Sequence, residues 1–109
     1  MDRESRLAQL AEVVNRIPEG RAASYGAVGI AMKNPTSGRI VGQMLAASSP
    51  VESLPWWRVV NSKGELSIAR RDPRLAQLQA KLLSEDGITL DAENRVPKSF
   101  LVSPGDLMD

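Results

Sequence analysis

Residues 24–45 read SYGAVGIAMKNPTSGRIVGQML, and this stretch decides the fold. Ser24 is a preferred N-cap residue and predicts a short helix over 25–32. A turn at 33–35 follows, and then Thr36 or Ser37 caps a further helix. The inner face of that helix carries Ile40, Val41, Met44 and Leu45. A short helix, a tight turn and a second helix together predict a helix-turn-helix.

Further helices are predicted on both sides of this stretch. Apolar residues recur at helical spacing over 3–17, and Pro18-Glu19-Gly20 ends that helix. Asp72-Pro73 combines an N-cap residue with a proline in the first helical turn, and Gly87 provides the end. The helix between them carries a predicted buried stripe of Leu75, Leu78, Leu82 and Leu83.

One short β-hairpin is predicted between the helices. Residues 58–60 and 65–68 flank the turn-forming segment 61–64, which is the pattern of the wing in a winged helix. Residues 88–90 form a candidate strand, and the tail from about 103 is expected to be loosely ordered. The predicted fold class is therefore mainly α with a short β-hairpin wing. It is a winged helix-turn-helix-like single domain over 1–109, a length that fits one small domain.

The composition excludes several kinds of chemistry. The chain has no cysteine and no histidine, which excludes disulfides, thiolate catalysis, Cys-based metal sites and acyl transfer by a Ser-His or Cys-His pair. We therefore expect neither a metal nor a cofactor. The apolar runs are too short to span a membrane, and the N-terminus is unlike a signal peptide. The sequence thus predicts a cytoplasmic protein with no membrane contact.

Charge is unevenly distributed along the chain. Residues 20–84 hold nine basic and three acidic side chains, a net charge of +6, whereas residues 1–19 carry −1 and residues 85–109 carry −4. A basic middle between acidic ends favours a polyanionic partner for the middle. The alternative is an ordinary solvated surface.

Both tryptophans of the chain stand side by side in the segment Pro55-Trp56-Trp57-Arg58-Val59-Val60. The proline stiffens the entry into this segment, and the two valines favour a strand at its exit. Two adjacent large aromatic side chains at such a junction either fill a core or hold a flat ligand.

Three blocks of the sequence resemble a known family. They are Gly20-Arg21-Ala22-Ala23-Ser24-Tyr25-Gly26, then Gly38-Arg39-Ile40-Val41-Gly42, then the segment 55–64, which reads PWWRVVNSKG. In this order and at this spacing they resemble the DNA-binding domain of O6-alkylguanine-DNA alkyltransferases, and the resemblance covers roughly residues 5–90. The resemblance implies double-stranded DNA as the partner.

The departure from the family pattern concerns its chemistry. Where the repair enzymes have Pro-Cys-His-Arg-Val, this chain has Trp56 at the alkyl-accepting cysteine and Trp57 at the activating histidine. The family's asparagine falls near Ser49 and its glutamate at Asp86, with Glu85 beside it. An indole nitrogen is too weakly acidic to accept the alkyl group. The chain thus resembles the alkyltransferase-like branch, which implies a protein that is not an enzyme.

Members of that branch bind O6-alkylguanine in duplex DNA by nucleotide flipping and flag it for nucleotide-excision repair. The implied partners are DNA containing O6-alkylguanine and nucleotide-excision repair proteins. The implied state is a cytoplasmic monomer, associated with the nucleoid if the source is bacterial. Two alternatives stay open: a winged-helix DNA binder with a regulatory role and no lesion pocket, or a residual hydrolase that uses Asp86 or Glu85 as its base.

The resemblance also assigns roles to individual residues. Arg39 becomes a finger that enters the duplex where the damaged base has left, and Tyr25 presses on the neighbouring phosphate. Trp56 becomes a wall of the lesion pocket. The remaining implied contacts are Arg58 and Val59 in the frame of the former active site, Arg70 and Arg71 against the alkylated base, and Ser24, Lys33 and Lys63 on phosphates.

Each of these roles has a structural alternative. Arg39 could be a solvent-exposed helical arginine, and Tyr25 could pack on the core. Trp56 could fill the space left by the changed active site, and core packing explains Trp57 at least as well as ligand contact. The arginines at 70 and 71 could contact phosphate or lie on plain surface.

Overall fold

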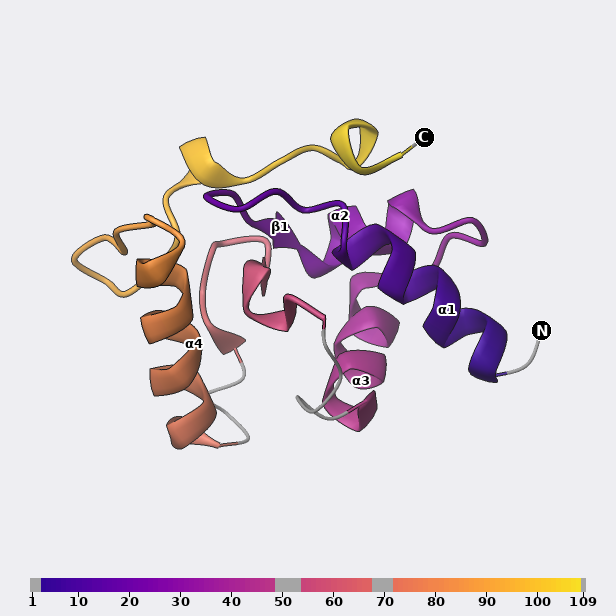
Figure 1. The fold of residues 1–109 in the computed structure, drawn as a ribbon, viewed down its shortest axis with the longest axis horizontal. Helices are drawn as coiled ribbons and strands as arrows, with labels where there is room; N and C mark the ends of the chain where they lie inside the picture. The colour runs from indigo at the N-terminus through magenta and orange to yellow at the C-terminus, as the bar shows by residue number, and fades with distance from the viewer. Residues whose placement is uncertain (1–2, 49–53, 68–71, 109) are drawn as a thin grey trace.

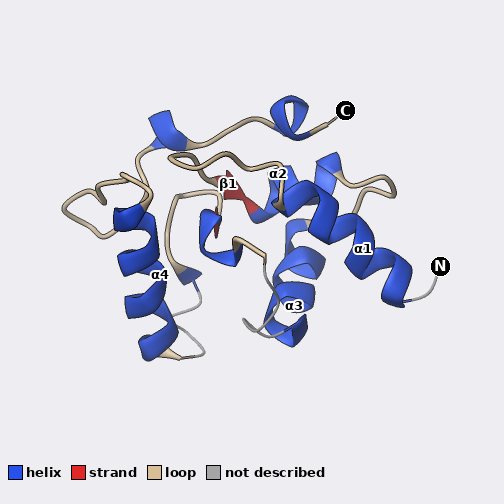
Figure 2. Ribbon diagram, in the orientation of Figure 1, coloured by secondary structure: helices blue, strands red, loops and turns tan. Residues whose placement is uncertain are grey.

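The computed structural model describes residues 3–48, 54–67 and 72–108, and these ranges are mainly helical (Figure 1, Figure 2). The α-helices are α1 (Arg3–Val14), α2 (Tyr25–Ala31), α3 (Gly38–Ser48) and α4 (Pro73–Glu85). Shorter 3-10 helices are η1 (Trp56–Arg58), η3 (Lys98–Phe100) and η4 (Pro104–Leu107). The mainly α class is confirmed. Within the described ranges, no helix is both long and apolar enough to cross a membrane.

Local sequence signals set the helix boundaries. Ser24, Ser37 and Asp72 each accept a hydrogen bond from a backbone N–H two or three residues further on, at 3.0, 3.2 and 2.9 Å. These three predicted capping residues are confirmed, and Gly87, with a φ of 91°, follows the end of α4. The first helix ends at Val14, earlier than predicted, and single turns carry the chain on to the buried Ile17.

Glycines let α2 and α3 approach closely. A Cβ at Gly29 would collide with the carbonyl oxygen of Thr36, and one at Gly38 would lie 2.8 Å from the backbone nitrogen of Gly26. The N–H of Thr36 donates to the carbonyl of Gly29 at 3.0 Å and closes the turn between the two helices. The helix-turn-helix predicted from 24–45 therefore forms, and it depends on residues without side chains.

The predicted wing is corrected in its pairing. Its first arm forms β2 (Val59–Val60), but β2 pairs in parallel with β1 (Ala23–Ser24), not with residues 65–67. Two backbone hydrogen bonds still close the turn, from the N–H of Asn61 to Glu65 at 3.1 Å and from the N–H of Gly64 to Asn61 at 2.9 Å. The second arm pairs elsewhere, because Glu65 bridges Arg95 and the Gly64 carbonyl accepts from residue 96 at 2.8 Å. Residue 68 lies outside the described residues.

The small sheet separates two apolar cores. Val59 packs into the core formed by α1, α2, α3 and η4, whereas Val60 packs into the core beneath α4. This follows from the strand geometry, since successive side chains point to opposite faces. Figure 1 shows the result, with α1 and α4 at opposite ends of the molecule and β1 between them. The segment that carries the tryptophans thus runs along the boundary between the two cores.

The C-terminal region also differs from expectation. Residues 88–90 have no strand partner, and Ile88 is held by a backbone bond to Leu83 and by burial. The tail expected to be loose from about 103 instead forms η4, where Ser103 and Asp106 cap each other and Leu107 is fully buried. Burial of that leucine side chain and the reciprocal cap give this short helix the contacts that a free tail lacks.

Candidate nucleic-acid interface

Arg39 lies in the first turn of α3 and is exposed to solvent. Its guanidinium makes no hydrogen bond or ion pair with any other described residue. The N-terminal end of a helix carries partial positive charge, and this adds to the charge of the side chain. An open cation at such a position is well placed to meet an anionic partner.

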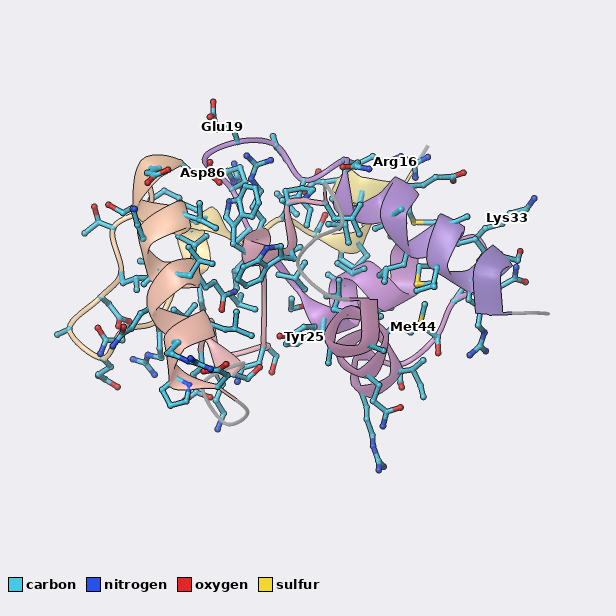
Figure 3. All side chains as sticks on the ribbon, turned by 60° about the horizontal axis from the view of Figure 1, so that its bottom comes forward. Arg16, Glu19, Tyr25, Lys33, Met44 and Asp86 are labelled. Carbon is cyan, nitrogen blue, oxygen red and sulfur yellow. The ribbon has the colours of Figure 1, made fainter. Side chains whose placement is uncertain are left out.

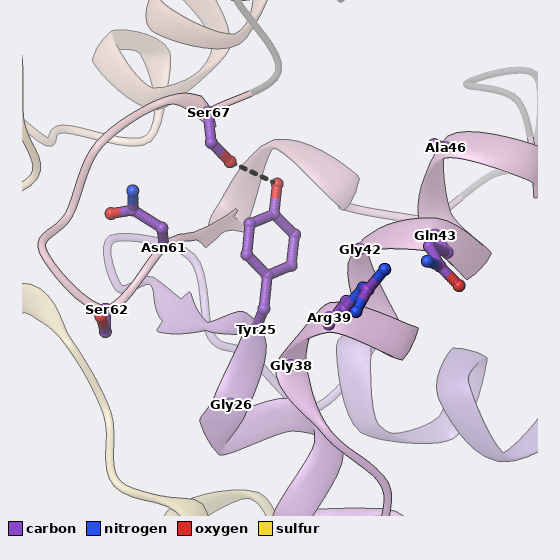
Figure 4. A pocket seen from close by; sticks show the side chains of 10 residues that line it. All are labelled: Tyr25, Gly26, Gly38, Arg39, Gly42, Gln43, Ala46, Asn61, Ser62 and Ser67. Carbon is purple, nitrogen blue, oxygen red and sulfur yellow. Dashed lines mark hydrogen bonds between the residues drawn. The ribbon is translucent and has the colours of Figure 1, made fainter. Parts of the chain in front are cut away.

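A pocket of about 540 Å³ opens beside Arg39 (Figure 4). Its lining includes the glycines Gly26, Gly38 and Gly42, and no carboxylate occurs among the described residues that line it. It is formed by α2, α3 and the turn after β2, with the lining residues Tyr25, Gly26, Gly38, Arg39, Gly42, Gln43, Ala46, Asn61, Ser62 and Ser67. The helix-turn-helix and the turn after β2 therefore meet at one hollow, with the Arg39 cation at its edge and no carboxylate among its described lining residues.

Tyr25 packs on the core and also reaches the pocket, so its position is compatible with both roles considered for it. Its ring packs against the first core and is partly buried, while its hydroxyl accepts a hydrogen bond from Ser67 at 3.3 Å inside the pocket (Figure 4). The phenol is thus anchored at its base and polar at its tip. This geometry places the hydroxyl beside whatever occupies the pocket.

The predicted phosphate contacts lie in different places. Ser24 uses its hydroxyl to cap α2. Lys63 is exposed in the turn after β2, next to the pocket residue Ser62. Lys33 is exposed between α2 and α3 and lies well away from Tyr25 (Figure 3). Of the two lysines, Lys63 is the one that adjoins a residue lining the pocket.

Trp57 and Arg58 belong to residues 55–60, here called the central segment. They form a hydrogen-bonded cluster with Asp86, the residue that follows α4. Arg58 donates to both carboxylate oxygens of Asp86, from Nε at 2.7 Å and from Nη2 at 3.2 Å, and from Nη1 to the carbonyl of Ile17 at 3.0 Å. The indole Nε1 of Trp57 donates to the same carboxylate at 3.0 Å, and the guanidinium carbon lies 5.3 Å from the centre of that ring.

This cluster serves the fold. All three guanidinium nitrogens of Arg58 donate inside the protein, and Val59 is 1% exposed, so both side chains stabilise the fold. The lesion contacts assigned to these two residues, which for Val59 are contacts of its main chain, stay predictions. Trp57 packs against the second core, which agrees with the core-packing role predicted as the alternative to ligand contact. The hydrogen bond from Arg58 holds the pKa of Asp86 below its ordinary value of 3.8, against the effect of burial, and Trp57 adds to the lowering. A carboxylate so stabilised is poorly suited to act as a general base.

Trp56 is partly buried and leans edge-on against Trp57, with ring centroids 6.3 Å apart at an interplanar angle of 87°. It is not among the described residues that line the pocket beside Arg39. The structure therefore does not bring Trp56 and Arg39 into one lining. Arg70, Arg71 and Ser49 lie outside the described residues, so their assigned roles stay predictions.

A second hollow, of about 400 Å³, lies between α4 and the chain around 90–94. Glu65 and Glu93 contribute carboxylates to it, and its described lining residues include no cation. Carboxylates repel a phosphate backbone, so the pocket beside Arg39 is the better nucleic-acid site of the two.

Sequence reasoning missed several residues of this site. Gln43 follows Arg39 by one helical turn, so the helical period alone could have indicated it. Asn61 and Ser67 reach the pocket through the turn after β2, and only the fold brings them there. Outside this pocket, sequence reasoning also missed Gln79, a buried polar residue within the leucine stripe of α4, although that signal is visible in the sequence.

Comparison with known proteins decides the family. Residues 7–88 match the model of the 6-O-methylguanine DNA methyltransferase, DNA binding domain. The chain belongs to this methyltransferase family. The match covers the helix-turn-helix, the central segment and α4, and the resemblance inferred from the three sequence blocks is thereby confirmed.

Individual proteins are also similar to this chain. The chain is 31% identical over 90 residues to the DNA base-flipping protein of Vibrio parahaemolyticus, covering 83% of this chain and 87% of that one. It is 34% identical over 80 residues to alkyltransferase-like protein 1 of Schizosaccharomyces pombe, covering 72% of each. A crystal structure of S. pombe Atl1 in complex with damaged DNA containing O6-carboxymethylguanine matches with a TM-score of 0.80 at 26% identity, over 95% of this chain and 100% of that one.

Proposed function

We propose that this protein is a non-enzymatic sensor of DNA damage, which binds O6-alkylguanine in duplex DNA after flipping the nucleotide out of the stack. One observation carries the proposal: Arg39 is an exposed cation, with no partner among the described residues, at the edge of a pocket that also contains Tyr25. A guanidinium at this position can stack in the gap left by the flipped base and donate to the orphaned partner base.

Two interactions offset the free-energy cost of flipping the nucleotide. Flipping costs a few kcal/mol of lost stacking and pairing. Arg39 lowers that cost by filling the gap in the duplex. Stacking of a base on an aromatic ring contributes about 1–3 kcal/mol, and the partly exposed ring of Trp56 is the candidate for it on the protein side. Relatives named DNA base-flipping protein and the similar complex with damaged DNA support this assignment.

The absence of alkyl transfer is part of the proposal. The chain has no cysteine or histidine, and tryptophan stands at both positions where the family's enzymes carry these residues. Asp86 is committed to Arg58 and Trp57, which argues against the residual hydrolase. A bound lesion would therefore remain in the DNA. We propose that nucleotide-excision repair proteins take it over from a monomeric sensor acting in the cytoplasm, on the nucleoid if the source is bacterial.

The proposal is tested by equilibrium binding to two duplexes that differ only in one guanine or one O6-methylguanine. We expect tighter binding to the modified duplex and full recovery of the methyl group in the released DNA. Equal affinities would favour the regulatory DNA binder. Loss of the methyl label from the DNA would favour an enzyme.

A further inference from the structure

Gln79 is a side-chain amide buried in the middle of α4. It is 2% exposed, the lowest value among the buried polar side chains of the described residues. Its Nε2 donates to the carbonyl of Trp57 at 3.1 Å and to the carbonyl of Val59 at 3.0 Å. Its Oε1 is also buried and has no hydrogen-bond partner among the described residues.

Because its oxygen is unpaired, this amide destabilises the apolar face of α4 in which it lies. A buried acceptor without a partner is destabilising, and an aliphatic side chain of the same size would avoid that cost. What the amide supplies is its two N–H groups. They satisfy two carbonyls, one on each side of Arg58, where the chain passes from η1 into β2 and where a helix end leaves carbonyls unpaired.

Gln79 of α4 and Asp86, the residue that caps its C-terminal end, thus hold the central segment at different levels. Asp86 binds the side chains of Trp57 and Arg58, and Gln79, about two turns earlier, binds the backbone on either side of Arg58. The side chain of Trp56 makes no hydrogen bond with any other described residue. Its ring makes an edge contact with the ring of Trp57, whose indole N–H is held by Asp86.

We propose that Gln79 is a positioning residue, which fixes the backbone at 57–59 so that the indole of Trp56 is presented in one orientation to the flipped base. The inference rests on the proposed function and adds to it the origin of lesion preference. A ring held in its binding orientation loses less conformational freedom on binding. Gln79 therefore affects binding of the modified base, whereas the affinity for ordinary duplex depends on Arg39 and the other exposed cations.

The test is Gln79→Met, which keeps the size and burial of the side chain and removes both N–H groups. Gln77→Met is the matched control, because Gln77 lies on the same helix and is exposed. Affinities are measured for the guanine and O6-methylguanine duplexes. We expect wild type and Gln77→Met to prefer the modified duplex equally, and Gln79→Met to lose about tenfold of that preference with unchanged affinity for the unmodified one.

Other outcomes overturn the inference. If Gln79→Met keeps the full preference, Gln79 does not position Trp56. If it weakens binding to both duplexes in the same proportion, its role is structural only. A wild-type protein without any preference would instead refute the proposed function, and the inference with it.

A second readout uses the free protein and does not depend on DNA. In ¹⁵N-labelled protein the two indole N–H groups give separate NMR signals, and that of Trp57 is hydrogen-bonded to Asp86. We expect the Trp56 signal to broaden or split in Gln79→Met, or in Gln79→Leu where Met does not fold, and to stay sharp in Gln77→Met. A sharp and unshifted Trp56 signal in the Gln79 variant contradicts the inference.

Discussion

Arg39 and Arg58 both belong to family-like blocks of the sequence, yet they lie in opposite surroundings. Arg39 projects from α3 at the edge of the pocket, exposed and without a partner among the described residues. The side chain of Arg58 is 15% exposed, and all three of its nitrogens donate to Asp86 or Ile17. Arginines of two such blocks therefore differ in what they are free to do: Arg58 stabilises the fold, whereas the charge of Arg39 is available to a partner.

The largest effect on stability is expected when the carboxylate that pairs with Arg58 is removed. Asp86→Ala leaves a largely buried guanidinium without its anion, and we expect the free energy of unfolding to fall by about 3–5 kcal/mol. Urea unfolding measures it. The control is Glu85→Ala, an exposed neighbour for which we expect a change within about 0.5 kcal/mol. Equal losses in the two variants would contradict the structural role of the cluster.

Arg39→Ala should behave in the opposite way. We expect unchanged stability and a loss of about 3 kcal/mol in binding to the O6-methylguanine duplex, which is roughly 150-fold in affinity. Titration of a labelled duplex measures the affinity. Arg74→Ala is the control, because its side chain is 89% exposed and lies on α4 outside the pocket. A similar loss in both variants would mean that Arg39 acts only as one more positive charge.

Trp56→Ala tests whether Trp56 contacts the lesion or only packs on the protein, as Trp57 does. We expect a loss of about 2 kcal/mol in binding to the modified duplex, because one stacked base loses its aromatic partner. Binding to the unmodified duplex should not change, and the same titration reports both affinities. If the two affinities fall together, Trp56 is a packing residue like Trp57.

At low pH, protonation of Asp86 should remove its contribution to the free energy of unfolding. Its pKa is lowered in the folded state, chiefly by the hydrogen bond from Arg58, so its stabilisation is present above the ordinary value of 3.8 and is lost as the pH falls through the lower folded value. We therefore expect the difference in unfolding free energy between wild type and Asp86→Asn to shrink below that pH. Urea unfolding from pH 7 down to about pH 2 measures it. A constant difference over this range would contradict the assignment.

The smallest expected effect concerns Lys63. If this exposed lysine contacts a phosphate, Lys63→Ala should weaken binding to both duplexes alike and reduce the slope of log affinity against log salt by about 1. The exposed Lys98 of η3 provides the control. An unchanged slope in Lys63→Ala would remove this residue from the interface.

The sequence predicted what local rules govern. Caps at Ser24 and Asp72 and the helix-turn-helix follow from residue types within a few positions of each other. Prediction from the sequence was wrong where segments far apart in the chain pair or pack with each other. Glu65 pairs with Arg95 and not with the first arm of the wing, and the apolar Leu107 draws the tail onto α1 and α2. The difference between Arg39 and Arg58 is of this second kind, because it depends on where Asp86 lies.

The most direct test of recognition by flipping places 2-aminopurine beside O6-methylguanine in a duplex and follows its fluorescence. Saturation with wild-type protein should raise the fluorescence, because the neighbouring base leaves the stack, and Arg39→Ala at saturation should produce a smaller rise. Tight binding by the wild-type protein with no change in fluorescence would show that the lesion stays in the helix, and would contradict the proposed function.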